Sequence, residues 1–410
     1  MRLLVVSYML PPMLYPQAIQ IGRLLMHMNG EIGAVTGRGA AGGLDCYQDL
    51  DRKLAFHVDV PSRPMLSGVA HQFATRFLPL YARSPDEYRG WVPVAEQAVT
   101  AKLAATGFRP EAIITFGEPM SDHILGARLK RSLGAPWIAH FSDPWYDNPF
   151  RRGQPLANLL NRRLEAETIR LADRVVFTSR ETIDLVMAKY PPSLRGKVAQ
   201  LPHSFDTDLY PVERAVHDGV VVRHIGNYYG HRTPYPLFRA LRALHDKSPG
   251  HLDGVRVELV GRVPRGMHWH PSFRALPAGL VTVRGMVGYR ESLRLMSDAD
   301  LLLVMDAPSD LSVFLPSKLI DYLGSGTPIL GIVPPGTSAE LIRRLGGATA
   351  DPRATADVAR ILGQAIEDAR GRRVSRPWGR PEVRAEFEPR RNAAAFEAIV
   401  REGIAEARRT

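Results

Sequence analysis

The stretch 314–330, FLPSKLIDYLGSGTPIL, contains a helix start, a lysine and an acidic residue in close succession. Proline is tolerated at a helix start, because its missing N–H would have no partner there. A helix is therefore predicted to begin at Pro316 or Ser317, to end at a glycine, 324 or 326, and to precede a buried strand. The free N–H groups of its first turn and the helix dipole favour a bound phosphate. Lys318 adds a positive charge, and Asp321, one turn on, is expected to bind a ribose hydroxyl. These features predict a site for the diphosphate and ribose of a nucleotide.

This stretch resembles the donor-binding motif Pro-Ser-Lys-Leu-x-Glu-Tyr-x-x-x-Gly-x-Pro-Ile of glycosyltransferase family 4, with Asp321 in place of the usual glutamate. That family consists of retaining enzymes with the GT-B fold. Further segments resemble the family in the expected order along the chain: 172–179, 201–206, 225–234, 283–287 and 300–304. The resemblance implies an α/β protein with two Rossmann-like domains, whose parallel sheets face a central cleft. It also implies a retaining glycosyltransferase.

The chain is long enough for two domains at 410 residues. Short apolar runs alternate with longer amphipathic stretches, which is typical of βαβ units. The alternation restarts after Pro202. Residues 1–205 are therefore predicted to form one domain, which binds the acceptor by the resemblance, and residues 206–391 a second, which binds the nucleotide-sugar. The polar stretch 203–217 is the expected linker, about which the domains would close, and helix 392–408 is expected to pack back on the first domain. Strands are predicted at 3–7, 32–36, 56–60, 112–116, 137–141 and 175–178, then at 220–225, 255–260, 281–283, 301–305 and 328–333.

In the second domain, Gly226 and Arg232 match the family's Gly-x-x-x-x-x-Lys/Arg. There the glycine lets the backbone approach the donor, and the basic residue binds its diphosphate. Asn227 stands where the family often has arginine. Arg232 and Lys318 thus remain as the charges expected to stabilise the departing diphosphate. The donor-binding residues implied, including a turn that would contact the base, are Gly226, Asn227, Gly285, Met286, Val287, Leu315, Pro316, Ser317, Lys318 and Asp321.

The first acid of the family's Glu-x7-Glu pair, which usually contacts the donor sugar, has no counterpart here, because Ser312 and Val313 stand in that region. Asp306 and Asp310 lie just upstream and are alternatives for the role, although loop surface is the simpler interpretation of both. The missing acid keeps open a non-catalytic protein that binds sugar nucleotides. A GT-B nucleotide-sugar epimerase is another alternative, but it would need an additional acid/base set.

In the first domain, acceptor contacts are expected at the carboxyl ends of the strands, where open α/β sheets bind their ligands. The segment AHFSDPWYD at 139–147 resembles the family's strand-end His-Asp-x-Trp. Either Asp143 or His140 is predicted to orient or deprotonate the acceptor hydroxyl, with Arg232 and Lys318 completing the catalytic set. Packing is the commoner role of a lone strand histidine. The acceptor side is expected to include Pro12, Gly117, Glu118 and Trp145.

Composition limits the remaining possibilities. Hydrophobic residues make up 45% and charged residues 23% of the chain, as in soluble globular proteins, and no apolar run is long enough to span a membrane. Cys46 is the only cysteine, which excludes an intrachain disulfide and a cysteine-ligated zinc site. We expect a cytoplasmic enzyme with no metal and no cofactor besides the nucleotide-sugar co-substrate, in which UDP or GDP is the expected nucleotide.

The net charge of +11 indicates an anionic partner. No nucleic-acid-binding motif is present, so phosphorylated substrates and the inner face of an anionic membrane are the candidates. One arginine cluster is either a solvated surface or a contact with a lipid phosphate. Together with the aromatic segment 61–93, it favours a lipid-linked acceptor, and thus a role in glycan, polysaccharide or glycoconjugate biosynthesis. The cluster comprises Arg370, Arg372, Arg373, Arg376 and Arg380.

Overall fold

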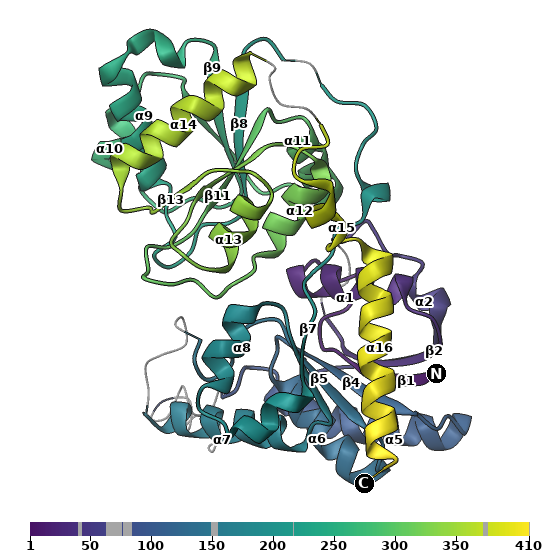
Figure 1. Ribbon diagram of the computed structural model, residues 1–410. Coiled ribbons are helices and arrows are strands. Elements are labelled where there is room, and N and C mark those ends of the chain that lie inside the picture. The colour runs from purple at the N-terminus through teal and green to yellow at the C-terminus, as the bar shows by residue number, and fades with distance from the viewer. Residues whose placement is uncertain are drawn as a thin grey trace. The chain divides into compact units, whose positions relative to one another are not determined.

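The computed structural model describes residues 1–39, 43–62, 76, 84–148, 155–215, 217–371 and 376–409. The chain forms two compact units, residues 1–202 together with 389–410, and residues 203–388 (Figure 1). The predicted linker 203–217 is thus assigned to the second unit. Most of the aromatic segment 61–93, and Arg372 and Arg373 of the arginine cluster, lie outside the described residues. No helix within the described ranges is both long and apolar enough to span a membrane.

The first unit is built on a seven-stranded sheet in the order β3-β2-β1-β4-β5-β6-β7. Each strand pairs in parallel with its neighbours. This is the strand order of a doubly wound fold. Successive strands are added toward one edge of the sheet from β1 to β3, and toward the opposite edge from β4 onward, so the order reverses between β1 and β4. We call this point the chain reversal. The strands are β1 (Arg2–Val6), β2 (Glu31–Gly37), β3 (Leu54–Val60), β4 (Ala112–Gly117), β5 (Trp137–Phe141), β6 (Arg174–Phe177) and β7 (Val198–Gln200).

Alternating side chains of these strands enter two separate cores. Leu3 and Val5 of β1 belong to one cluster and Leu4 and Val6 to the other, because successive strand residues point to opposite faces. A sheet that is buried on both faces needs helices on both sides. The helices are α1 (Pro16–His27), α2 (Leu50–Lys53), α5 (Val92–Thr106), α6 (Ser121–Leu133), α7 (Pro155–Leu171), α8 (Arg180–Met187) and α16 (Pro389–Ala407).

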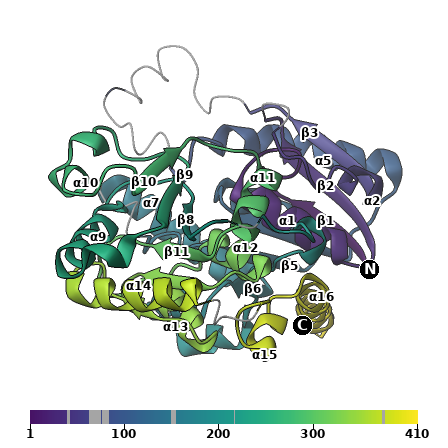
Figure 2. The same ribbon diagram turned by 90° about the horizontal axis from the view of Figure 1, so that it is seen from above.

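The C-terminal helix α16 is part of the first unit, where it lies beside α1 (Figures 1 and 2). Its buried residues include Phe396 and Val400, which belong to the same cluster as strands β1 and β4. On the same helix, Glu406 accepts a hydrogen bond from Arg174 of β6 at 2.6 Å. Segments from opposite ends of the chain therefore share one core.

The second unit contains a six-stranded sheet in the order β10-β9-β8-β11-β12-β13, again parallel throughout. It repeats the doubly wound order, with the chain reversal between β8 and β11. The two predicted parallel α/β domains are therefore confirmed. The strands are β8 (Val220–Ile225), β9 (Val255–Val260), β10 (Val281–Arg284), β11 (Leu301–Met305), β12 (Ile329–Ile332) and β13 (Thr349–Ala350).

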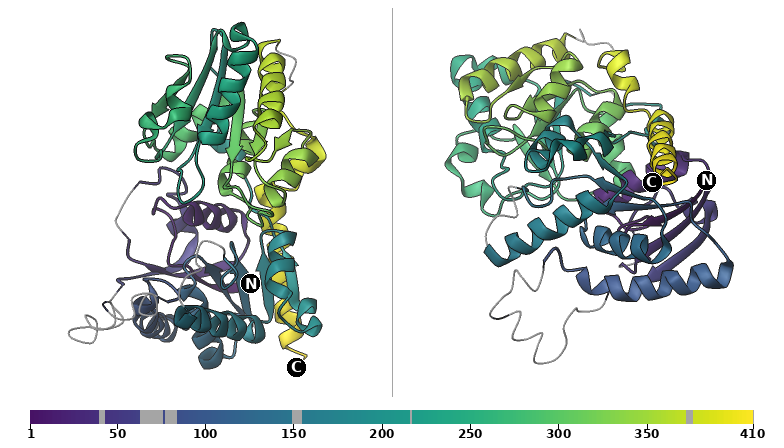
Figure 3. Two further views of the ribbon diagram at one scale, coloured as in Figure 1. Left: turned by 90° about the vertical axis from the view of Figure 1, so that its left-hand side faces the viewer. Right: turned by 60° about the horizontal axis from the view of Figure 1, so that its bottom comes forward.

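Helices α9 and α14 lie side by side in this unit (Figure 3, left). Apolar residues of both, such as Leu241 and Leu362, join the core that includes β8 and β11. The helices of the second unit are α9 (Tyr235–Lys247), α10 (Pro271–Arg274), α11 (Tyr289–Ser297), α12 (Ser317–Ser325), α13 (Thr337–Arg344), α14 (Thr355–Arg370) and α15 (Pro381–Ala385).

The predicted linker is anchored within the second unit by hydrogen bonds. Phe205 N donates to Phe387 O at 3.0 Å, and the Tyr210 hydroxyl donates to Asp321 O at 2.7 Å. Arg214 donates to Ser325 O at 2.7 Å. The composition of this polar stretch is that of an extended linker, but Tyr210 and Arg214 donate to carbonyls of α12, and Phe205 donates to Phe387 O.

Tyr322 joins α12 to the end of the central strand β8. Its hydroxyl accepts from Ile225 N at 2.7 Å and lies 3.1 Å from Ile225 O. The side chain is fully buried, so water cannot replace these bonds. This contact fixes the position of the turn that follows β8.

Replacing Tyr322 with Phe leaves the buried Ile225 N–H without a partner. We expect Tyr322→Phe to lower the free energy of unfolding by about 1–3 kcal/mol, measured by urea-induced unfolding. Tyr15→Phe is the matched control: Tyr15 is 49% exposed, and its change is expected to stay within about 0.5 kcal/mol. Equal stability of the two variants would contradict this role for Tyr322.

Candidate functional site

Helix α12 begins at Ser317, as predicted, with Pro316 as its N-cap residue and no side-chain cap hydrogen bond. It ends at Gly326, whose φ of +64° is readily adopted only by glycine. The N–H groups of a first helical turn have no partner within the helix. Leu319 N donates to Pro316 O at 2.9 Å, but no side chain caps the N–H groups of Ser317 and Lys318, so these two remain available to an anion.

Lys318 extends from this helix to the turn after β8. A Cβ added at Gly226 would lie 2.4 Å from Lys318 Nζ, and the φ of Gly226 is +150°. Glycine is thus required both by the backbone conformation and by the close approach of the lysine. Burial lowers the pKa of the Lys318 ammonium to about 7, and the nearby charge of Arg232 acts in the same direction, while Asp306 opposes it. The lysine therefore lies in a position where an added negative charge would be strongly favoured.

Arg232 is held beside Lys318 by a buried ion pair. Its Nη2 lies 2.9 Å from Asp306 Oδ1, with both side chains almost fully buried. Its Nη1 donates to the Tyr229 hydroxyl at 3.1 Å. Burial opposes the charged form, but the pairing with Asp306 raises the pKa of Arg232 above its ordinary value. Its buried Nε has no hydrogen-bond partner, so one donor of the guanidinium is left for a ligand.

Asp306 is buried beside Arg232, whereas the sequence suggested that it lies on a loop surface. It follows β11 directly and is 5% exposed. Besides Arg232, it accepts from Ser312 Oγ at 2.8 Å and from Ala307 N at 2.8 Å. Asp310, by contrast, has a fully solvated carboxylate that pairs with Arg353, as the loop-surface interpretation predicts. The sequence signal for Asp306 is its place after a central strand, at the point where the chain reverses direction across the sheet.

His224 of β8 is a further buried polar residue that the sequence did not single out. Its Nδ1 lies 2.8 Å from Leu303 O, so it donates a proton to that carbonyl. Its Nε2 is buried and has no partner. Burial, together with the charges of Lys318 and Arg232, lowers the pKa of His224 well below its ordinary value. The imidazole is therefore neutral and adds no third positive charge under the two cations.

Asp321 and Asn227 are occupied by contacts within the protein. Asp321 is 6% exposed, and its Oδ1 accepts from the Tyr289 hydroxyl at 3.0 Å. Asn227 Oδ1 accepts from Arg262 N at 2.9 Å, which links the turns after β8 and β9. Both residues therefore shape the site from within, and the ribose contact of Asp321 stays a prediction.

The remaining predicted donor residues lie around these turns. Leu315 is buried, while Pro316 and Ser317 are half-buried. Gly285, Met286 and Val287 follow the edge strand β10, and Met286 is 55% exposed. The segment 285–287 thus presents its backbone and an apolar side chain at the carboxyl end of the sheet, as a base-binding turn requires.

In the first unit, the predicted acceptor residues follow neighbouring strands. Pro12 is exposed after β1, and Gly117 is the buried last residue of β4. Glu118 has a φ of +85°, a conformation that is costly for a residue with a side chain. Gln17 of α1, which the sequence did not suggest, donates to Gly117 O at 3.0 Å and accepts from Ser142 Oγ at 2.8 Å. It therefore ties together the ends of β4 and β5.

His140 and Trp145 occupy packed positions. His140 is 5% exposed, between Phe116 and Phe396, and burial lowers its pKa to about 4. A general base works best with a pKa near the operating pH, so this environment argues against the catalytic role predicted for His140. Trp145 is 1% exposed and donates to Asn161 Oδ1 at 3.0 Å, which argues against contact with an acceptor. Asp143 is half-buried, at the carboxyl end of the sheet.

Among the described residues, no group of three or more His, Cys, Asp or Glu side chains could hold a metal ion. The candidate site in the second unit is therefore described by two cations, a helix N-terminus and a glycine turn. Such a set can bind a diphosphate and stabilise negative charge that develops on it.

Residues 39–202 match the family model described as a glycosyl transferase 4-like domain. Among solved structures, the chain is similar to sucrose-phosphate synthase from Thermosynechococcus elongatus, at a TM-score of 0.70 and 16% identity over 99% of both chains. It is also similar to HepE from Anabaena in complex with UDP and glucose, at a TM-score of 0.59 and 17% identity over 99% of this chain and 98% of that one.

A third similar structure is WaaG, a glycosyltransferase involved in lipopolysaccharide biosynthesis, at a TM-score of 0.55 and 14% identity over 99% of this chain and 98% of that one. No curated protein sequence matches the chain. The similar structures confirm the predicted fold, and the family match supports the resemblance to glycosyltransferase family 4 for residues 39–202.

Adding a side chain at Gly226 would displace Lys318 Nζ. We expect Gly226→Ala to weaken the binding of UDP at least about tenfold, which corresponds to about 1.4 kcal/mol, measured by isothermal titration calorimetry. In the control Gly196→Ala, the added Cβ would meet no atom within 4 Å, and UDP affinity should not change. Wild-type affinity in Gly226→Ala would refute the close approach of Lys318 as a requirement for binding.

The low pKa of Lys318 predicts a pH dependence of binding. An anionic ligand favours the protonated lysine, so binding takes up a proton wherever free Lys318 is neutral. The dissociation constant of UDP-glucose should be flat below about pH 7 and should rise above it by up to about tenfold per pH unit. Calorimetry across pH 6–9 measures this slope. Lys318→Arg keeps its charge throughout, so its slope should vanish; equal slopes would contradict the assignment.

Proposed function

We propose that this chain, a glycosyltransferase with a glycosyl transferase 4-like domain at residues 39–202, transfers a glycosyl group from a nucleoside diphosphate sugar to an acceptor hydroxyl with retention of anomeric configuration. The observation that supports this best is the meeting of Lys318, Arg232 and the uncapped start of α12 at the chain reversal of the second sheet. Open α/β sheets bind their ligands at such a point.

UDP is the nucleotide that we propose first, with GDP as the alternative. Support comes from the similar structure HepE, which is described in complex with UDP and with UDP-glucose. In this chain, the diphosphate would lie between the first turn of α12 and the turn 226–232. The base would lie toward 285–287, where backbone groups and the exposed Met286 are available.

The proposed reaction breaks the bond between the anomeric carbon and the diphosphate oxygen. The acceptor oxygen forms its bond to the same carbon on the same face, and its proton passes to an oxygen of the departing phosphate. Lys318 and Arg232 stabilise the charge on the leaving group. Asp306 acts as a positioning residue, because its contacts with Arg232 and Ser312 hold the guanidinium in place.

The acceptor is assigned to the first unit, at the carboxyl ends of β4 and β5. Gln17 links these ends, and the half-buried Asp143 lies beside them in sequence. Since His140 is packed with a lowered pKa, we favour Asp143 for orienting the acceptor hydroxyl. A lipid-linked or polysaccharide acceptor, and thus a role in glycan synthesis, is part of this proposal.

Lys318→Ala provides the test of this function. Wild-type protein should show a thermal shift with one class among UDP-, GDP-, ADP- and dTDP-sugars and should release the nucleotide. Lys318→Ala should lose the shift and at least about a hundredfold of kcat/KM. Arg360→Ala, an exposed arginine of the same unit, is the control and should behave like the wild type. A wild-type response in Lys318→Ala would refute the assigned site.

One observation favours the non-catalytic alternative. Ser312, in the region of the family's first glutamate, is buried and donates to Asp306, so this residue supplies no free carboxylate for the sugar. Binding without release of sugar, with or without candidate acceptors, would support that alternative. Proton NMR of the first product formed distinguishes retention from inversion; an inverted anomer would overturn the mechanism.

A further inference from the structure

Helix α7 (Figure 1) exposes large apolar side chains on its outer surface. Leu156 is 53% exposed and Leu159 is 65% exposed. Together with Arg163, they follow the spacing i, i+3, i+7, which places them on one face of a helix. The inner face of the same helix is packed: Ala157 is 6% exposed, and Ile169 belongs to the core of the first unit. Because other residues of α7 already hold it against the first unit, Leu156 and Leu159 are not needed to attach the helix.

The same part of α7 has an uncompensated positive charge. Arg162 and Arg163 are exposed, and neither is in an ion pair with a residue that the structure describes. Residues 155–164 contain no acid. The next acidic residue, Glu165, is fully buried and accepts from Tyr146 N and the Tyr190 hydroxyl at 2.8 and 2.7 Å. Leucines and free guanidinium groups thus share one exposed surface.

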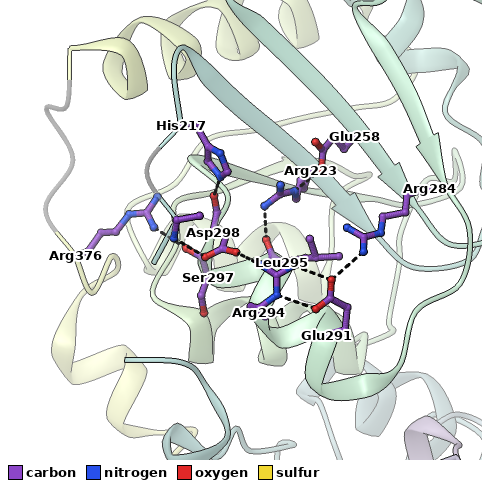
Figure 4. A network of polar contacts seen from close by, with 11 residues as sticks. His217, Arg223, Glu258, Arg284, Glu291, Arg294, Leu295, Ser297, Asp298 and Arg376 are labelled. Carbon is purple, nitrogen blue, oxygen red and sulfur yellow. Dashed lines mark hydrogen bonds and ion pairs between the residues drawn. The ribbon is translucent and has the colours of Figure 1, made fainter. Parts of the chain in front are cut away.

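Two members of the arginine cluster near the C-terminus, Arg370 and Arg376, make hydrogen bonds within the second unit. Arg376 donates to the carbonyls of Ser297 and Ala299 (Figure 4). Arg370 pairs with Glu367 and donates to the carbonyls of His251 and Asp253. These two guanidinium groups hold the second unit together. Arg162 and Arg163 of α7 have no such contacts with the described residues.

We propose that the start of α7, residues 155–163, docks on an anionic lipid surface. Leu156 and Leu159 enter the boundary between headgroups and acyl chains, and Arg162 and Arg163 contact lipid phosphates. Interfacial helices bury apolar side chains such as leucine at this boundary and use arginines for attraction to anionic lipids, and a long arginine side chain beside a leucine can still reach the headgroups. Nucleic acid would use the arginines but gain nothing from the leucines. This inference goes beyond the proposed function, since the docking surface and the donor site belong to different units.

Vesicle flotation tests this proposal with the full chain. Wild-type protein should float with vesicles of phosphatidylcholine and phosphatidylglycerol, but not with phosphatidylcholine alone. The double variant Leu156→Ser/Leu159→Ser should reduce flotation at least about fivefold, and Arg162→Ser/Arg163→Ser should remove its dependence on the anionic lipid and on salt. Trp269→Ser is the matched control, because Trp269 is 80% exposed on the other unit; its flotation should equal that of the wild type.

The thermal shift with UDP-sugar should be the same in all four proteins, which shows that the variants fold and separates this proposal from the donor site. Flotation of the leucine variant at the wild-type level would overturn the proposal. So would light scattering that shows a wild-type dimer, abolished in the leucine variant, without any vesicle binding. In that case a second copy of the chain covers the surface.

Discussion

A buried ion pair between Arg232 and Asp306 joins the ends of the two central strands of the second sheet. Arg232 follows β8 and Asp306 follows β11, on either side of the chain reversal. Each residue is only 5% exposed, so removal of one partner would leave the other charge buried and uncompensated, which is costly. The pair therefore fixes the geometry of both turns. It also provides a positive charge inside the protein that is only partly neutralised.

The other features of the donor site are electrostatic consequences of that pair. Lys318 lies near the Arg232 charge, and this proximity, added to burial, destabilises its ammonium. His224, beneath both cations, remains neutral for the same reason. A diphosphate supplies the negative charge that the arrangement lacks. The site is thus already organised for an anion, which is the condition for stabilising a leaving group at little reorganisation cost.

The opposite end of α12 is connected to the segments that link the two units. Its carbonyls at 321, 323 and 325 accept from Tyr210, Arg384 and Arg214. Positive side chains at a helix C-terminus are favoured by the helix dipole. The helix that offers its N-terminus to the donor is therefore fixed at its C-terminus by residues near both chain crossings, at 203–217 and 376–388.

Local sequence determined the positions of most strands and the limits of helix α12. Alternation of apolar runs and helical stretches predicted eleven of the thirteen strands that lie in the described parts of the chain, and among these it missed the short edge strands β7 and β13. The limits of α12 followed from Pro316 and Gly326, because proline and glycine restrict or extend backbone conformation irrespective of the rest of the fold. The sequence predicted Gly226, Arg232 and Lys318 as residues of one donor site, whereas the close approach of Lys318 to Gly226 is seen only in the structure.

Other properties were decided only by the tertiary structure. Asp306 resembled loop surface in sequence but lies buried against Arg232. Trp145 matched the family's strand-end segment and His140 was a candidate base beside it, but both side chains are buried. The stretch 203–217 has linker composition, yet its donors meet carbonyls of α12. In each case, what matters is the solvent exposure and the partner of a polar group. Both depend on residues distant in sequence, whereas backbone preference and hydrophobic periodicity are local properties of the chain.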